Sequence, residues 1–417
     1  MQSDRVENTD LVVGDAGERL SWVGRLAEVF GAFGKLGLIS FGGPIAHLGY
    51  FRTEFVQKRH WISDAEFADL VALCQFLPGP ASSQVVFALG MRRAGVIGAL
   101  VASLCFMLPS AAMMIAFAYG VAHVGDLSHA RWLHGLKLAA VVVVAQAVWG
   151  MGKNLCPDRA RLSTCLAAAA ILLAWPGAIV QLGIIAGGAM VGWMLYRRDL
   201  GATVPTLQDN GVWRTHLVAA GALLVFFALL IALPAVAAAT GSETWKIFDG
   251  FYRSGSLVFG GGHVVLPLLR AEVVPRGWVT DDQFLAGYGA AQAVPGPLFT
   301  FSAYLGAAMH RSGIAPWVNG LWCLLAIFLP AWLLIGGALP FWHRLRRTAW
   351  AQAGLRGANA AVVGVLLAAW YSPVFLEGVK SARDVAAGVV AFGLLVFWRV
   401  PVLGIVGGLA LTGWLGW

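Results

Sequence analysis

Charged residues are scarce in this sequence. Asp, Glu, Lys and Arg make up 12% of its 417 residues and hydrophobic residues 59%, whereas a soluble globular domain carries about 25% charged residues. A helix needs about 20 apolar residues to cross a bilayer, and a barrel strand needs about 10 alternating ones. Long uncharged runs therefore predict an all-α integral membrane protein. They cover residues 94–125, 162–196, 215–242, 283–310 and 357–376.

Motifs of soluble enzymes are also missing. The sequence has no HExxH, no P-loop and no GxGxxG after a predicted strand. Zinc proteolysis, dinucleotide binding and ATP use therefore have no support. A pump driven by a nucleotide domain within this chain is excluded, whereas a separate ATPase partner stays open. The five cysteines show no CxxC spacing and lie mostly in apolar runs, which is typical of free packing thiols. We expect no cofactor, no metal site and no enzymatic activity.

The net charge of +8 has two explanations that both stay open. Lys and Arg are enriched in the cytoplasmic loops of multi-pass proteins, and a positive charge also attracts an anionic substrate. Neither explanation calls for a nucleic-acid partner. Residues 1–21 are polar and lack the apolar core of a signal peptide. We therefore expect a cytoplasmic N-terminus and a multi-pass protein in the lipid bilayer of the plasma (inner) membrane.

One pattern occurs twice along the chain. Residues 40–48 read SFGGPIAHL and residues 258–266 read VFGGGHVVL. Each is followed by a Trp-Xaa-Ser/Thr-Asp helix start and then by a Pro-Gly-Pro triplet, at an offset of 217 to 218 residues. Pro109 and Pro330 extend the match further along the chain. The chain therefore consists of two copies of one unit.

The repeat predicts how the chain is organised. A polar tail (1–21) precedes a first membrane repeat (22–198), a polar loop with a linker helix (199–243) and a second membrane repeat (244–417). The length of a membrane-spanning helix gives about 10–13 membrane segments. Because of the linker helix, the chain traverses the membrane an odd number of times between equivalent points of the two copies. We therefore expect two inverted repeats, as in secondary transporters with broken helices near the midplane.

Helix boundaries follow from the apolar segments and their breaks. Helices are predicted over 22–56, 64–92, 95–121, 131–152, 162–175, 178–197, 215–240, 244–275, 280–310, 314–341, 352–372, 383–398 and 401–417. Whether the broken segments span the membrane or re-enter it stays open. The last two segments of each copy, parted by Pro176 or Pro401, are either two short spans or one bent element.

Glycine clusters break an apolar segment in each copy. Glycine lets other groups approach the backbone closely, and irregular backbone at membrane depth must be buried in protein or line a wet cavity. A broken helix also has a new N-terminus whose N–H groups suit an anion. These breaks are therefore candidate substrate-binding elements, with a simple kink or close helix packing as the alternative. They comprise Gly42, Gly43, Gly260, Gly261 and Gly262.

The Pro-Gly-Pro triplets form a second class of candidates. The first Pro stops a helix and the second can begin the next half-helix. Hydroxyl groups just beyond each triplet suit an oxyanion, and a Gln precedes each triplet by three residues. For the Gln residues, an interhelical hydrogen bond is an equally good interpretation. This class contains Gln75, Pro78, Gly79, Pro80, Ser82, Ser83, Gln292, Pro295, Gly296, Pro297 and Thr300.

Basic residues at the breaks form a third class. Arg52 and Arg270 occupy equivalent positions at the exit of each broken segment, where they either attract a dianion or lie at the membrane interface. His47 and His263 are proton carriers, anion contacts or polar residues with a structural partner. The sequences SDAE and TDDQ that begin at residues 63 and 280 are capping boxes, which we interpret as structural.

The motifs resemble those of one known family. FGGPIAHLGYF, QFLPGPASSQ, FGGGHVVLPLL and AAQAVPGPLFTFSAYLG are similar to segments of the chromate ion transporter family, over residues 25–150 and 245–372. The resemblance implies a two-domain secondary transporter in the plasma membrane that exports chromate and confers chromate resistance. It also implies transport driven by the membrane potential or an ion gradient, with sulfate as the expected competitor.

Other functions stay open beside this resemblance. The physiological substrate of such a transporter could be sulfate or molybdate, with resistance incidental. An anion channel or an intramembrane enzyme is a more distant alternative, and the sequence shows no nucleophile and base placed together. The small-residue segment 183–187 suits either a homodimer or packing within the chain.

Overall fold

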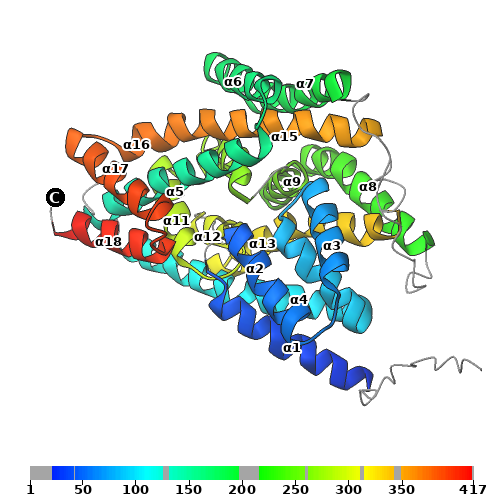
Figure 1. Ribbon diagram of the computed structural model, residues 1–417. Helices are drawn as coiled ribbons and strands as arrows, with labels where there is room; N and C mark the ends of the chain where they lie inside the picture. The colour runs from blue at the N-terminus through cyan, green and yellow to red at the C-terminus, as the bar shows by residue number, and fades with distance from the viewer. Residues whose placement is uncertain are drawn as a thin grey trace, which may run out of the picture.

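The computed structural model describes residues 21–41, 43–124, 131–196, 216–258, 262–309, 314–341 and 349–415. These residues form helices and contain no β-strand, which confirms the all-α prediction (Figure 1). Five of the described helical segments are long and apolar enough to cross a membrane. They are Ala81–His123, Leu133–Leu155, Leu217–Thr240, Pro316–Phe341 and Trp350–Gly378.

The first repeat begins with a broken helix. The glycine break separates α1 (Trp22–Ile39) from α2 (Gly43–Phe51), which continues as the π-helix η1 (Arg52–Lys58). α3 (Asp64–Phe76) precedes the Pro-Gly-Pro triplet and α4 (Ala81–Val124) follows it. α4 leaves helical geometry at Ala94 and Gly95, so it consists of a half-helix and a long span, as predicted. The repeat ends with α5 (Arg131–Leu155), α6 (Arg159–Ala174) and α7 (Ala178–Tyr196).

The second repeat follows the linker helix α8 (His216–Thr240) and keeps the same order. It contains α9 (Glu243–Ser256), η3 (Gly262–Val264), α10 (Val265–Val273), α11 (Asp281–Ala293), η4 (Leu298–Thr300), α12 (Phe301–Ala308), α13 (Pro316–Ala338), η5 (Leu339–Phe341), α15 (Ala349–Ala369), η6 (Trp370–Phe375), α16 (Leu376–Gly378), α17 (Ala382–Val396) and α18 (Val402–Trp414). The pairs α6–α7 and α17–α18 are each two separate helices rather than one bent element. Both predicted capping boxes are present, at the starts of α3 and α11.

The last two helices of each repeat pack on a helix of the other repeat, an arrangement that we call the exchange. The α6–α7 pair of the first repeat packs on α15 of the second, and the α17–α18 pair of the second packs on α5 of the first. The equivalent helices α5 and α15 also contact each other, and Figure 1 shows them running in opposite directions along the colour gradient. Polar contacts reinforce this arrangement, since Lys137 of α5 forms an ion pair with Asp282 at 2.5 Å and His134 Nε2 forms a hydrogen bond with Asp384 at 2.7 Å.

Small residues allow the closest helix approach in this exchange. Gly188 of α7 faces α15, where an added Cβ would lie 2.5 Å from the Cβ of Ala361 and 2.9 Å from the carbonyl oxygen of Gly357. Its neighbour Gly187 has no heavy atom within 4 Å of the same position. Part of the small-residue face of α7 is therefore used for packing within the chain, since small residues let helix backbones approach in membranes.

This difference between adjacent glycines gives a test of the exchange. Gly188→Leu is expected to destabilise the protein by about 1–3 kcal/mol because the side chain overfills the α7–α15 contact. Gly187→Leu is the matched control and should leave the midpoint of thermal unfolding in detergent unchanged. Equal midpoints for the two variants would contradict the packing of α7 on α15.

Candidate substrate-binding site

The two repeats bind each other at their broken helices. The backbone N–H of Gly79, in the first Pro-Gly-Pro triplet, donates to the carbonyl of Val258 at 2.7 Å. The backbone N–H of Gly296, in the second triplet, donates to the carbonyl of Ser40 at 2.8 Å. Ser40 and Val258 are equivalent residues just before the two glycine breaks. Each triplet therefore crosses to the glycine break of the other repeat, and we call these two contacts the crossings.

Both crossing glycines have a backbone that other residues rarely adopt. Their φ angles are +119° for Gly79 and +94° for Gly296. An added Cβ on Gly79 would lie 3.3 Å from the Cβ of Ala331, and one on Gly296 would lie 3.2 Å from the Cβ of Ser110. Ala331 and Ser110 are themselves equivalent, because each follows the proline within the long helix of its repeat. The crossings are thus two versions of one local structure.

The crossing at Gly296 is polar, and we call it the polar crossing. The side chains of Ser40, His47, Ser110 and Thr300 are all buried there. Thr300 Oγ1 donates to the carbonyl of Pro297 at 2.8 Å, so Ser110 Oγ donates to Thr300 Oγ1 at 2.6 Å. His47 Nε2 lies 3.0 Å from the carbonyl of Ser40 and donates to it. Two further polar atoms, Ser40 Oγ and His47 Nδ1, have no hydrogen-bond partner among the described residues.

The crossing at Gly79 is apolar on the sides of the glycine break and the long helix, and we call it the apolar crossing. Val258, Val265 and Ala331 replace Ser40, His47 and Ser110 at the equivalent positions. Ser83, which is equivalent to Thr300, stays polar, and Ser82 and Gln84 are buried beside it. The side-chain atoms Ser83 Oγ and Gln84 Oε1 have no partner within the described part of the chain.

Buried polar atoms without partners are costly, by about 1–3 kcal/mol each. Such atoms occur at both crossings. The polar crossing is the better candidate for a hydrogen-bonding ligand because its glycine break and long helix also carry Ser40, His47 and Ser110, where the other crossing has apolar residues.

The structure places the glycine breaks only in part. Gly43 begins α2 with φ +76°, and Gly262 begins η3. Gly42, Gly260 and Gly261 lie outside the described residues. α2 therefore begins close to the polar crossing, three residues after Ser40.

The remaining polar candidates are scattered. His263 Nδ1 lies 2.7 Å from the hydroxyl of Tyr288, so this histidine has a structural partner. Gln75 is exposed at the end of α3, and Gln292 has a buried Nε2 without a partner among the described residues. Ser82 is buried beside the first triplet, next to Ser83. Pro78, Pro80, Pro295 and Pro297 shape the triplets, and the carbonyl of Pro78 accepts from the Gln84 side chain at 2.8 Å.

The two arginines at the exits of the broken segments are paired with carboxylates. Arg52 binds Asp64 through two hydrogen bonds of 2.7 and 2.8 Å, and Arg270 binds Asp281 through bonds of 2.7 and 3.0 Å. The hydrogen bond from Arg52 holds the pKa of Asp64 below its ordinary value, so this pair is ionised at neutral pH. Both arginines thus join the end of a broken segment to the start of the next helix, a geometry that favours a positioning role.

Ser40 and Ser110, which lie at the polar crossing, are not among the candidates predicted from the sequence. Ser40 stands inside the repeated motif, where the prediction rested on glycine and histidine. Ser110 follows Pro109, which aligns with Pro330. A comparison of polar and apolar residues at equivalent positions would have singled out both serines. Among the described residues, no group of three or more His, Cys, Asp or Glu side chains could hold a metal ion.

The crossing glycines give a direct test of this geometry. Gly79→Ala and Gly296→Ala are each expected to destabilise the protein by about 1–3 kcal/mol, because the positive φ is unfavourable for alanine. Gly49→Ala is the control, since Gly49 lies within α2 and has open space around its Cβ position. Thermal unfolding in detergent measures the difference. A midpoint for either crossing variant equal to that of Gly49→Ala would argue against the crossings.

Comparison with known proteins agrees with the repeated motifs. The chain matches the family described as "Chromate transporter" over residues 27–193 and 245–414. It is 29% identical to the "Chromate transport protein" of Pseudomonas aeruginosa, over 93% of this chain and 92% of that protein. It is 26% identical to the "Chromate transport protein" of Cupriavidus metallidurans, over 91% of this chain and 90% of that protein. No solved structure matches the chain.

The family match includes both glycine breaks, both Pro-Gly-Pro triplets and every helix that makes the crossings. Together with the apolar spans, it establishes that this chain belongs to the chromate transporter family and is a multi-pass membrane protein that transports chromate.

Proposed function

We propose that this protein exports chromate across the plasma membrane, that the membrane potential drives the export, and that chromate binds at the polar crossing. The observation that carries the proposal is the difference between the crossings: the two share one backbone structure, but the glycine break and the long helix present buried polar side chains to the triplet at only one of them. One of the two equivalent contacts is enough to bind the ligand. The other contact then serves to support the fold.

The polar crossing has groups suited to a tetrahedral dianion. Such an anion accepts hydrogen bonds at each oxygen, and bonds to a charged group contribute about 1.5–3 kcal/mol each. Ser40 Oγ is buried and unused within the described residues. The hydroxyl groups of Ser110 and Thr300 bond to each other and can rotate toward a ligand. The N-terminus of α2 adds the partial positive charge of its free N–H groups.

An inside-negative potential suits export of a dianion. Moving one charge through 100 mV contributes about 2.3 kcal/mol, so two charges contribute about 4.6 kcal/mol. That free energy corresponds to a concentration ratio of roughly a thousandfold. Export by uniport or by exchange for another ion therefore needs no nucleotide hydrolysis by the chain.

The exchanged architecture supports alternating access by two inverted repeats. In transporters of this type one repeat or helix bundle moves against another around a fixed midplane site. The opposite directions of α5 and α15 in Figure 1 agree with inversion. We place the N-terminus in the cytoplasm, because this orientation puts Arg92, Arg93 and Lys153 on the side where basic residues are enriched.

Sulfate is the second candidate substrate. Hydroxyl groups and helix N–H groups recognise the shape and charge of an oxyanion rather than its central atom. The polar crossing therefore has no feature that would reject sulfate, which is also a tetrahedral dianion. Sulfate is expected to compete with chromate at the same site.

Uptake into inverted membrane vesicles tests direction and driving force. We expect labelled chromate to accumulate when the vesicle interior is made positive, and to leave when the potential is collapsed. Excess sulfate should inhibit the uptake. Chromate accumulation that does not depend on the potential would overturn electrogenic export. Sulfate uptake without chromate uptake would assign the site to another oxyanion.

Removal of the unused hydroxyl tests the location of the site. Ser40→Ala should raise the KM for chromate about tenfold or more, since it removes a hydrogen bond to a charged ligand. The same change should leave the free energy of unfolding equal or slightly higher, because it deletes a buried donor without a partner. A lower melting midpoint with unchanged KM would mean that Ser40 has only a structural role.

Ser83→Ala is the matched comparison, because Ser83 is also buried without a partner in the described chain but lies at the apolar crossing. We expect its KM to stay within about twofold of the wild type, well below the effect of one hydrogen bond to a charged group. The reverse pattern, with a large effect for Ser83→Ala alone, would move the substrate to the other crossing.

A further inference from the structure

A groove lies between α1, α4, α8 and α13, and its lining contains none of the residues named above at the two crossings. It encloses about 580 Å³, a volume within the usual range for small-molecule sites. α4, α8 and α13 are candidate membrane spans, so three of the four helices around the groove are expected to contact lipid.

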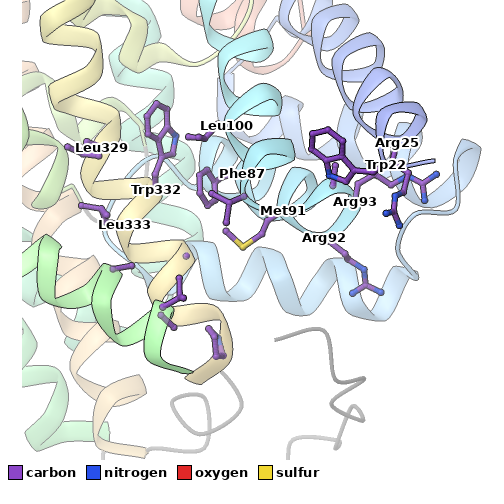
Figure 2. A pocket seen from close by; sticks show the side chains of 18 residues that line it. Trp22, Arg25, Phe87, Met91, Arg92, Arg93, Leu100, Leu329, Trp332 and Leu333 are labelled. Carbon is purple, nitrogen blue, oxygen red and sulfur yellow. The ribbon is translucent and has the colours of Figure 1, made fainter. Parts of the chain in front are cut away.

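The groove has a basic end and an apolar end. Figure 2 shows Arg25, Arg92 and Arg93 together on one side with Trp22, while Leu329 and Leu333 lie on the opposite side. Phe87, Met91 and Trp332 lie between these ends. A ligand that fills the groove must therefore have a negatively charged head and a long apolar body.

The described residues give the basic end a net charge close to one. Arg93 pairs with Glu28 at 2.5 Å, and Arg92 pairs with Glu66 at 2.7 Å. Arg25 is exposed and has no ion-pair partner within the described ranges. One uncompensated positive charge matches a phosphodiester, which carries one negative charge. It matches a chromate or sulfate dianion poorly, and the apolar walls have few hydrogen-bond donors for such an ion.

The side wall of the groove faces the bilayer. α8 has strongly exposed apolar residues on its outer side, with Leu217 at 87% and Leu224 at 70% exposure, while its Val218, Ala219 and Ala222 line the groove. Trp22, at the basic end, is 45% exposed, and tryptophan favours the membrane–water interface. A membrane lipid can therefore enter from the side with its head at the interface and its chains among the apolar residues.

We propose that this groove binds one anionic phospholipid, with the phosphodiester at Arg25 and an acyl chain between Phe87 and Leu333. Basic pockets between membrane helices on the cytoplasmic side are suited to such headgroups. The bound lipid would join α1 and α4 of the first repeat to the linker helix and to α13 of the second. The groove is thus a lipid site at a contact between the repeats.

Native mass spectrometry of the purified full-length protein tests the site. The protein is titrated with phosphatidylglycerol and, separately, with phosphatidylcholine of the same acyl chains. We expect the wild type to retain phosphatidylglycerol preferentially. Arg25→Gln should reduce that preference about fivefold, the factor that corresponds to about 1 kcal/mol per basic residue near a membrane surface. Arg25→Lys should retain most of it.

Two further variants control for folding and for general charge effects. Arg383→Gln removes an exposed arginine on α17, away from the groove, and should leave the preference unchanged. Gly336→Leu should reduce retention of both lipids, because its Cβ would point toward Phe87 and Met91 at 3.7 and 3.8 Å without a backbone clash.

Three results would overturn the proposal. One is equal retention of the two lipids by the wild type, and another is equal behaviour of Arg25→Gln and Arg383→Gln. The third is displacement of phosphatidylglycerol by millimolar chromate or sulfate, which would assign the groove to free oxyanions entering the transporter. None of these results bears on whether chromate binds at the polar crossing.

Discussion

The structure depends on how broken helices satisfy their backbone groups inside a membrane. A helix interrupted by glycine or proline leaves N–H and C=O groups that lipid cannot bind, and each unsatisfied group costs several kcal/mol. This chain meets the requirement by exchange, since Gly79 donates to Val258 and Gly296 donates to Ser40. Backbone groups at the breaks of one repeat therefore find hydrogen-bond partners in the other repeat. The helix pairs α6–α7 and α17–α18 pack on α15 and α5 of the other repeat, which extends the same principle to the outer helices.

A symmetric backbone with asymmetric side chains explains how the two halves can have different roles. The positions of Ser40, His47 and Ser110 are occupied by Val258, Val265 and Ala331 in the other copy. Packing at the two crossings is alike, because both triplet glycines meet a small residue at nearly the same distance. The polar substitutions therefore change hydrogen bonding with little change in shape, as expected if one crossing binds the ligand and the other supports the fold.

Much of this fold could be predicted from the sequence. Uncharged runs, repeated motifs and capping boxes gave the helices and their breaks, because these signals are local. The partners of the breaks could not be predicted, because equal motifs allow pairing within a repeat as well as between repeats. Arg52 shows the same limit: its position beside a break suggested an anion contact or a place at the membrane interface, and its pairing with Asp64 appears only in the fold. The polar crossing was likewise only partly predicted, since Ser40 and Ser110 become neighbours of one triplet only after folding.

The crossings also constrain how the protein can move. If each repeat moved as an independent body, both crossing hydrogen bonds would break together, and two buried N–H groups would lose their partners. Motion in which each triplet follows the glycine break of the opposite repeat keeps both bonds. The half-helix at the start of α4 can turn at Ala94 and Gly95, and α12 is separate from α13. The moving unit is therefore expected to be a triplet, its half-helix and the glycine break of the other repeat, with the long spans as the frame around it.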